Sequence, residues 1–278
     1  MNMNKLSLAL LPLVAVLATG CGADDGDNGA TGPAGSTGVD GINGSNGTNG
    51  TNGTNGGNLA IFTVQLTNLT YGQPFSPAAI VLHEPGFNTF MDGETASIGL
   101  EQLAEGGNPA ELMSEALAAT QYLDAIVTDE ATPPRSIGAM STLFVPLLDI
   151  DNLQISFTTM LVDTNDAFTG LNAANISNMA VGQTKSFMAP TWDAGTEENT
   201  ETASTIPGPA AVAAGGGGAS AGFDAERDDL FDLVHFHRGV VTIANASDRS
   251  KEGLSTSVLT ETDRWDNPTA RLVVTRTR

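Results

Sequence analysis

The stretch TMLVDTNDAFTGLN (Thr159–Asn172) changes character twice within fourteen residues. An apolar run ends at Val162, four polar residues follow at 163–166, and apolar residues resume at Ala167. Asp and Asn side chains often bond nearby backbone amides in turns, and their oxygens are also the ligands that Ca²⁺ prefers. The stretch therefore predicts the end of a strand and a polar turn, which either only shapes the chain or holds an ion.

A self-contained calcium loop does not fit this turn. An EF-hand loop needs oxygen ligands at alternating positions, a central glycine and a final glutamate, and residues 163–175 depart from that pattern after two positions. A second candidate segment lies downstream, where Asp193 and Glu197 are separated by the turn formers Ala194 and Gly195. Two carboxylates on one turn repel each other unless a cation joins them, so the two segments together predict a discontinuous Ca²⁺ site.

The rest of the chain after residue 58 consists mainly of strand patterns. Apolar residues alternate in 58–70, and similar apolar segments bounded by turn residues recur; they span residues 73–86, 136–147, 153–162, 175–188, 237–245 and 269–278. Residues 96–120 change to a helical period and predict two short amphipathic helices, separated by Gly106-Gly107 and by Asn108-Pro109 as N-cap and N1. The low-complexity segment 206–222 predicts a mobile surface loop.

These patterns indicate a mainly β chain, with an antiparallel β-sandwich and a short helical insertion. A domain of residues 58–278 is long enough to bury one core. The net charge is −21, and Lys and Arg are absent between Lys5 and Arg135. Phosphate neutralisation needs clustered cations, so we expect no nucleic-acid partner. A strongly acidic surface suits solubility or divalent cations.

The N-terminus has the pattern of an export signal rather than of a folded element. Lys5 precedes an apolar stretch, Leu6–Leu17, that is too short to span a bilayer as a mature helix. The sequence ATGC at 18–21 resembles a bacterial lipoprotein box. It predicts a signal peptide over 1–20, a lipidated Cys21 and, because Gly22 rather than Asp follows, an outer-membrane anchor. The alternative is an ordinary secretory signal with an incidental cysteine. No other cysteine exists for a disulfide.

Residues 21–57, which begin with Cys21, have a collagen-like period. Glycine occupies every third position from Gly26 to Gly56, but Pro33 is the only proline in the run. A triple helix is poorly preorganised without proline. We therefore expect a spacer, with a weak trimer through this stalk as the alternative.

Four segments resemble one known family in the order in which they occur: residues 68–86, 159–171, 191–201 and 264–274. They resemble the spondin N-terminal domain, over roughly Ala60 to Arg278. The resemblance implies an antiparallel β-sandwich with Ca²⁺ bound by loops at one end, and it assigns the ligands to Asp166, Asp193 and Glu197. It implies no catalysis. Animal members of the family act in adhesion and matrix recognition.

The sequence thus favours a surface-exposed lipoprotein that binds an extracellular protein or glycan. An alternative is a metal-dependent hydrolase. His235 and His237 would share one face of a strand, and with His83 they would form a three-His zinc site. A third alternative is a purely structural envelope component.

Overall fold

A computed structural model describes residues 58–218, 222–243 and 253–278. The signal peptide, Cys21 and the glycine-triplet segment therefore lie outside the described residues. The described residues belong to one compact unit, Asn52–Arg278. In these ranges no helix combines the length and apolar character needed to cross a membrane.

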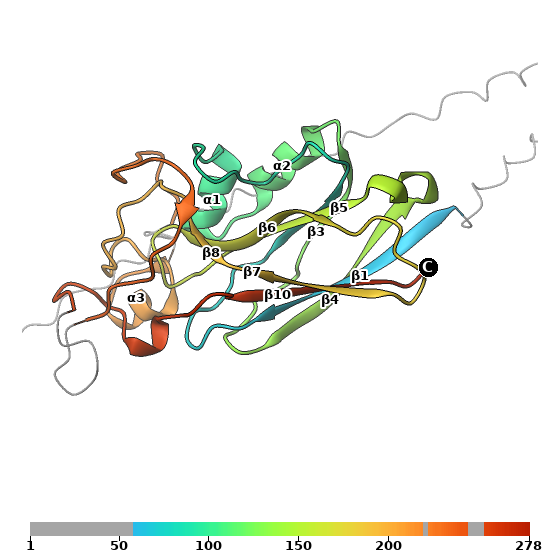
Figure 1. The fold of residues 1–278 in the computed structure, drawn as a ribbon. Coiled ribbons are helices and arrows are strands. Elements are labelled where there is room, and N and C mark those ends of the chain that lie inside the picture. Colours follow the sequence, from blue (N-terminus) through green and yellow to red (C-terminus); the bar gives the residue numbers. More distant parts are fainter. Residues whose placement is uncertain (1–57, 219–221, 244–252) are drawn as a thin grey trace, which may run out of the picture. The chain divides into compact units, whose positions relative to one another are not determined.

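One sheet has four strands, all paired antiparallel in the order β4-β1-β10-β7 (Figure 1). The strands are β1 (Leu59–Asn68), β4 (Ile137–Pro146), β7 (Thr184–Ala189) and β10 (Ala270–Arg276). In β1 the side chains at even positions from Ala60 to Leu66 are buried, as the period of two requires. The alternation in the sequence therefore fixes which face of this sheet points inward.

The second sheet has six strands, also antiparallel, in the order β3-β2-β5-β6-β8-β9. The strands are β2 (Ala79–His83), β3 (Tyr122–Val127), β5 (Gln154–Met160), β6 (Ala167–Asn175), β8 (Thr191–Asp193) and β9 (His235–Phe236). All five residues of β2 and the last six of β5 are buried. These central strands are therefore covered on both faces.

An apolar core fills the space between the two sheets. The first sheet contributes side chains such as Phe62, Leu143 and Leu272, and the second sheet faces them with Leu82 and Phe157. Fully burying a side chain of this size stabilises the fold by about 1.5–3 kcal/mol. The predicted antiparallel β-sandwich is confirmed.

Two helices, α1 (Ile98–Gly106) and α2 (Ala110–Ala118), cover the outer face of the six-stranded sheet (Figure 1). The Ser97 side chain caps α1, and Gly107 ends it in the left-handed conformation with φ 67°. The side chain of Asn108 accepts the Ala110 N–H at 3.1 Å, although the N-cap position itself is Pro109. The helical insertion is confirmed, and its second helix begins one residue later than predicted.

Three segments differ from their predicted structure. In 175–188 only the end is a new strand, because β7 begins at Thr184 and residues 176–183 form turns and irregular structure. No strand runs from 237 to 243 in the described chain, because the short strand β9 ends at Phe236 and Gly239 then adopts φ 91°. The described part of 206–222 does not project as a loop. It contains the short helix α3 (Pro209–Ala213), and Ile206 and Ala211 are buried in a small apolar cluster with Val240 and Leu259. The described residues include the 3₁₀ helices η1 (Leu147–Asn152) and η3 (Glu261–Asp263).

Candidate functional site

Two of the predicted ligands come together at one end of the six-stranded sheet. Asp166 is the last residue of the polar turn, directly before β6, and Asp193 is the last residue of β8. The antiparallel register pairs Ala167 with Asp193. Strand pairing therefore places both carboxylates on adjacent strands, although 27 positions separate them in the sequence.

Asp166 is fully buried, and its two carboxylate oxygens differ. Oδ2 accepts the N–H of Thr196 at 2.8 Å, the hydroxyl of Thr196 at 3.2 Å and the N–H of Glu197 at 3.2 Å. Oδ1 is buried without a hydrogen-bond partner. A buried carboxylate oxygen without a partner is costly, so this atom marks the place where a cation would stabilise the fold.

The surrounding charges add to this cost. Burial, and then the charge of Asp193, raise the pKa of Asp166 well above its ordinary value. Burial and the neighbouring Glu105 raise the pKa of Glu197 to about 8. The side chain of Glu197 accepts a hydrogen bond of 3.4 Å from Asn165. The carboxylates at this end are therefore close enough to oppose each other's ionisation.

Glu105 joins this group, and the sequence reasoning missed it. Its Oε2 accepts the N–H of Asp224 at 2.8 Å, whereas its Oε1 is buried without a partner. Burial raises the pKa of Glu105 to about 7. One helical turn earlier, Glu101 is equally buried but pairs with Arg227 at 2.6 Å. The sequence does contain a pattern that points to Glu105. Two acids lie at i and i+4 beside the apolar face of a predicted helix, and the helix has no basic residue to balance their charge.

The donor set fits a hard cation. Ca²⁺ takes six to eight oxygens from loops that need not be contiguous, and Asp166, Asp193, Glu197 and Glu105 all supply carboxylate oxygens. Across the described ranges, no three His, Cys, Asp or Glu side chains already stand as a formed metal-binding group. Completing a site would therefore require glutamate side-chain rotation together with backbone or water oxygens.

The other polar residues of the turn shape the backbone. Asp163 accepts the N–H of Ala210 at 2.8 Å, and its own N–H donates to the Gln73 side chain at 3.1 Å. Asn165 accepts the N–H of Glu201 at 3.2 Å. The Thr164 hydroxyl donates to the Leu161 carbonyl at 2.6 Å and accepts the Ala167 N–H at 3.1 Å. Three of the four polar residues of the turn therefore make structural hydrogen bonds, and the fourth, Asp166, has one oxygen left without a partner.

The structure does not bring the three histidines together. In the strand register, His83 lies opposite Gln154 and Gln154 lies opposite Asn175, the last residue of β6. His235 lies opposite Asp193, and Asp193 lies opposite Ala167, the first residue of β6. The length of β6 alone separates these ends by about 26 Å at ~3.3 Å per residue. The predicted three-His zinc site therefore has no geometric basis.

His83 has a structural role instead. Its Nδ1 lies 2.8 Å from the Glu84 carbonyl, so Nδ1 carries the proton and donates. Its Nε2 then accepts the Ser156 hydroxyl at 2.8 Å. Burial lowers the pKa of His83. Both ring nitrogens are occupied, and no lone pair is left for a metal.

The other two histidines face Asp193. The Nε2 atoms of His235 and His237 lie 3.8 Å and 3.7 Å from Asp193 Oδ2. The N–H of Gly239 donates to His237 Nδ1 at 2.9 Å, so the neutral ring carries its proton on Nε2, toward Asn199 Oδ1 at 3.1 Å. Burial lowers the pKa of His237 to about 4. His237 therefore acts as a neutral hydrogen-bond donor and offers no Nε2 lone pair to a transition metal.

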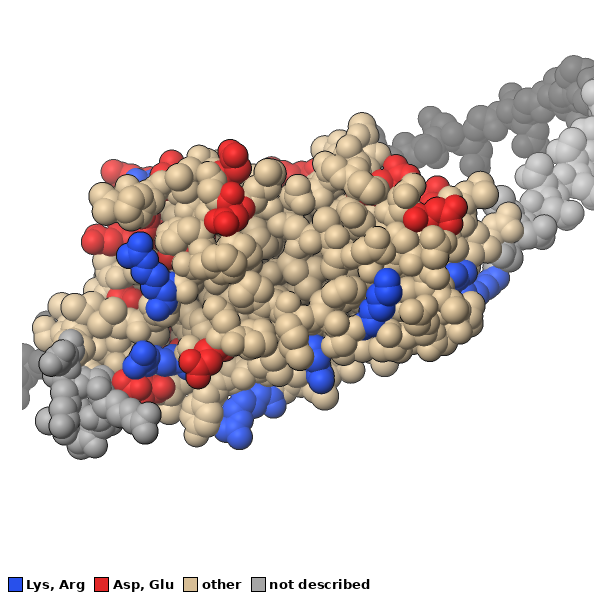
Figure 2. All heavy atoms as spheres, viewed as in Figure 1, with Lys and Arg blue, Asp and Glu red and all other residues tan. Residues whose placement is uncertain are grey.

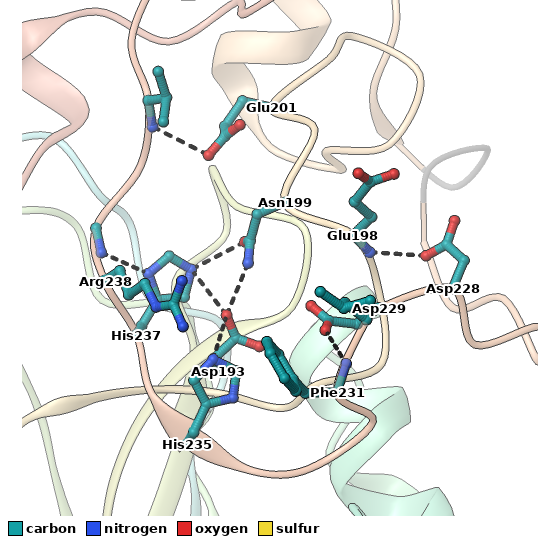
Figure 3. A pocket seen from close by; sticks show the side chains of 13 residues that line it. Asp193, Glu198, Asn199, Glu201, Asp228, Asp229, Phe231, His235, His237 and Arg238 are labelled. Carbon is teal, nitrogen blue, oxygen red and sulfur yellow. Dashed lines mark hydrogen bonds and ion pairs between the residues drawn. The ribbon is translucent and has the colours of Figure 1, made fainter.

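These side chains border a cavity of about 540 Å³ (Figure 3). Asn199 links two residues that line this cavity: its amide N–H donates to Asp193 at 2.8 Å, and its amide oxygen accepts from His237 at 3.1 Å. Glu198 and Glu201 line the cavity from the segment after β8, and Asp228 and Asp229 line it from the loop before β9. The cavity is thus bounded by the Asp193 end of β8 and by a segment of 228–241.

Comparison with known families agrees with this architecture. Residues 67–210 match the model of the Spondin_N family, the spondin N-terminal domain. The match covers more than half of the 278 residues and includes Asp166, Asp193 and Glu197. No curated protein matches the sequence. With the antiparallel sandwich in place and the family model spanning most of it, the chain belongs to the spondin N-terminal domain family.

Proposed function

We propose that this chain is a cell-surface lipoprotein whose calcium-stabilised spondin domain recognises an extracellular protein or glycan. Family membership suggests an extracellular domain of recognition or adhesion type. The lipoprotein-like sequence at 18–21 supports attachment through Cys21 to the outer membrane. The glycine-triplet segment between Cys21 and the domain supports a spacer that holds the domain away from the lipid.

The observation that carries the calcium proposal is the unpartnered Asp166 Oδ1. This oxygen is buried beside the turn that ends β8, where Asp193 already opposes the ionisation of Asp166. Burying a carboxylate charge away from water costs roughly several kcal/mol unless the charge is paired. A bound cation would offset that cost, and nothing else among the described residues does so for this atom.

Asp166, Asp193 and Glu197 would hold the ion, with Glu105 as a further ligand. Calcium suits this set better than magnesium, because Mg²⁺ requires strict octahedral geometry and gives up water reluctantly. The bound ion supplies positive charge among carboxylates that otherwise repel each other.

Such an ion would join three separate parts of the chain. The turn at 163–166, the segment after β8 and the C-terminal end of α1 each contribute one or more of the acids. The segment after β8 also lines the 540 Å³ cavity through Glu198 and Asn199. Calcium would therefore order the loops at the end of the sandwich where a partner can reach them.

Thermal unfolding in calcium and in chelator tests the proposal. Binding to the native state alone adds about 2.7 kcal/mol at a hundredfold excess over Kd, so calcium should raise Tm by several degrees and magnesium should substitute poorly. Asp193→Asn should remove most of the response, whereas the matched variant Asp163→Asn should keep it. Identical melting of the wild-type chain in calcium and in EDTA contradicts the calcium site.

A separate experiment tests the anchor and the spacer. Cys21→Ser should leave an unprocessed precursor or release soluble protein, and wild-type membrane attachment of this variant contradicts lipidation. Deleting residues 22–57 should leave the Tm of the domain unchanged, because a glycine-rich segment buries no core. A large loss of stability on deletion would instead support a trimeric stalk.

A further inference from the structure

The cavity beside β9 has an exposed apolar rim. Three of its lining side chains are apolar and strongly exposed: Leu230 at 85%, Phe231 at 56% and Val241 at 45%. Phe236, just along the chain, is 54% exposed and stacks on Trp192 at 4.1 Å between ring centroids. Exposed apolar side chains grouped around one cavity are typical of interaction sites.

The walls of the same cavity are acidic. Five lining residues are carboxylates and one, Arg238, is a guanidinium; the carboxylates are Asp193, Glu198, Glu201, Asp228 and Asp229. The described residues provide no Lys or Arg ion pair to any of these five. In Figure 2, Asp and Glu gather around the end of the molecule where α1 lies, with a few Lys and Arg among them, and other Lys and Arg lie along the lower edge of the view.

Glu201 gives an independent indication of a missing partner. Its side chain lines the cavity, is only 1% exposed, and uses Oε1 to accept the N–H of Val241 at 3.1 Å (Figure 3). Its Oε2 is buried and has no hydrogen-bond partner. Burial raises the pKa of Glu201 to about 7. A carboxylate held in this way is stabilised when a cationic donor approaches it.

We propose that the cavity receives a lysine or arginine side chain from a partner protein, whose neighbouring apolar residues pack on Leu230 and Phe231. A long basic side chain suits the site, because its methylene stem packs on apolar surface while its charged head reaches the carboxylates. Phe231 also offers a ring face to the cation. This inference rests on the proposed recognition function and names its partner class, but it requires no calcium.

The site lies mostly outside the segment that matches the family model. Leu230, Phe231 and Asp229 follow residue 210, where the match ends. The matched segment supplies Asp193, Glu198 and Glu201, and the residues after it supply the apolar rim and the other two carboxylates. A neutral glycan can donate hydroxyl hydrogen bonds to the carboxylates but brings no positive charge to balance them, so a basic protein segment is the ligand that the charges favour.

Calorimetric titration of the full-length chain with short capped peptides tests this inference. We expect Ac-GLRLG-NH₂ to bind at least tenfold more tightly than Ac-GLELG-NH₂, which reverses the charge, and than Ac-GSRSG-NH₂, which lacks the apolar neighbours. The binding should weaken as salt rises, because two of the lining carboxylates, Glu198 and Asp228, are solvent-exposed. Maltohexaose serves as the neutral glycan probe and should not bind.

A matched pair of double variants locates the binding. Asp229→Asn with Leu230→Ser should weaken Ac-GLRLG-NH₂ at least tenfold, and the asparagine oxygen can still accept the Phe231 N–H that Asp229 accepts at 2.8 Å. The control, Asp149→Asn with Leu148→Ser, changes the same residue types in η1, where Leu148 is 91% exposed. It should leave the affinity unchanged.

Three results overturn the inference: equal affinity for the arginine and glutamate peptides, equal loss in both double variants, or binding of maltohexaose without binding of the arginine peptide. Each is separable from failure of the calcium proposal, which is measured by Tm in calcium and EDTA without any peptide. Calcium stabilisation without peptide binding removes only this inference, and peptide binding without calcium stabilisation removes only the metal site.

Discussion

The two ends of the six-stranded sheet bury polar side chains in opposite ways. At one end, His83, Ser156 and Ala173 form a closed chain of hydrogen bonds of 2.8 Å and 2.9 Å. The atom left without a partner nearby is a neutral amide oxygen, on Gln154. At the other end, carboxylate oxygens of Asp166, Glu105 and Glu201 are buried without partners.

The difference lies in charge rather than in burial. An unpaired neutral group costs about 1–3 kcal/mol, and a charged group costs more. Only the acidic end therefore gains substantially from an added cation, either a metal ion or the side chain of a partner. The closed end gives a reference against which each effect at the acidic end can be measured.

The largest expected effect is at the closed end. His83→Ala removes both ring hydrogen bonds, leaves the Ser156 hydroxyl without its acceptor and opens a cavity beside Phe87, whose ring centroid lies 5.1 Å away. We expect a loss of about 3–4 kcal/mol in urea unfolding. The loss should be the same in calcium and in EDTA. A calcium-dependent loss would mean that the two ends are coupled.

Asp166→Asn should have the opposite dependence on calcium. In EDTA the amide removes a buried charge that Asp193 repels, so Tm should rise relative to wild type. In excess calcium the variant should lack the stabilisation of about 2.7 kcal/mol expected at a hundredfold excess over Kd. Differential scanning calorimetry in both buffers measures this reversal, in which the Tm of the variant is above that of wild type in EDTA and below it in calcium. A variant that calcium stabilises as much as wild type would show that Asp166 is not a ligand.

A smaller effect is expected three residues earlier, at Asp163. Burial raises the pKa of Asp163 to about 6, above its ordinary value of 3.8. The folded state then binds more protons than the unfolded state between these values, so this group's contribution to stability is complete below about pH 4 and is lost as pH rises to about 6.

Asp163→Asn should therefore flatten that part of the pH profile. The asparagine oxygen can still accept the Ala210 N–H, and the variant should gain roughly 2 kcal/mol over wild type at pH 7 while matching it near pH 4. Urea unfolding between pH 4 and 7, in EDTA throughout, measures the slope. Parallel profiles for the two proteins would show that Asp163 does not titrate in this range.

Much of the sandwich could be predicted because its strands are regular. The alternation in β1 and the segment that forms β10 are complete in the sequence, and Gly106-Gly107 and Pro109 separate the two helices. In contrast, β8 has three residues and β9 has two. Strands this short carry no period of their own, and they are specified by pairing, β8 with β6 and β9 with β8.

The candidate site was predictable to a similar extent. Asp166, Asp193 and Glu197 lie in segments that resemble a known family, and register then brings the two aspartates together. Glu105 was hidden because an acid in an amphipathic helix ordinarily faces solvent. The cavity forms where the loop of 228–241 packs on residues 193–201, and no local pattern encodes such loop packing.

The smallest expected effect concerns the helix that ends near the acidic site. Ser97 caps α1, where its hydroxyl oxygen accepts the Leu100 N–H at 3.1 Å and its O–H donates to Glu115 at 2.6 Å. Ser97→Ala should cost about 1 kcal/mol, the usual value of an N-cap. Glu105 lies at the other end of the same helix, more than two turns away, and the packing of Leu100 and Leu103 under α1 holds that end in place.

The loss should therefore be equal in calcium and in EDTA, and the calcium-induced rise in Tm should not change. Ser114→Ala in α2 is the control, because its hydroxyl donates to the Ala110 carbonyl within the helix at 3.0 Å and caps nothing. If Ser97→Ala keeps wild-type stability in EDTA but is less stable than wild type in calcium, calcium binding is coupled to the N-terminus of α1. The calcium-dependent region would then extend beyond the carboxylates around Asp166.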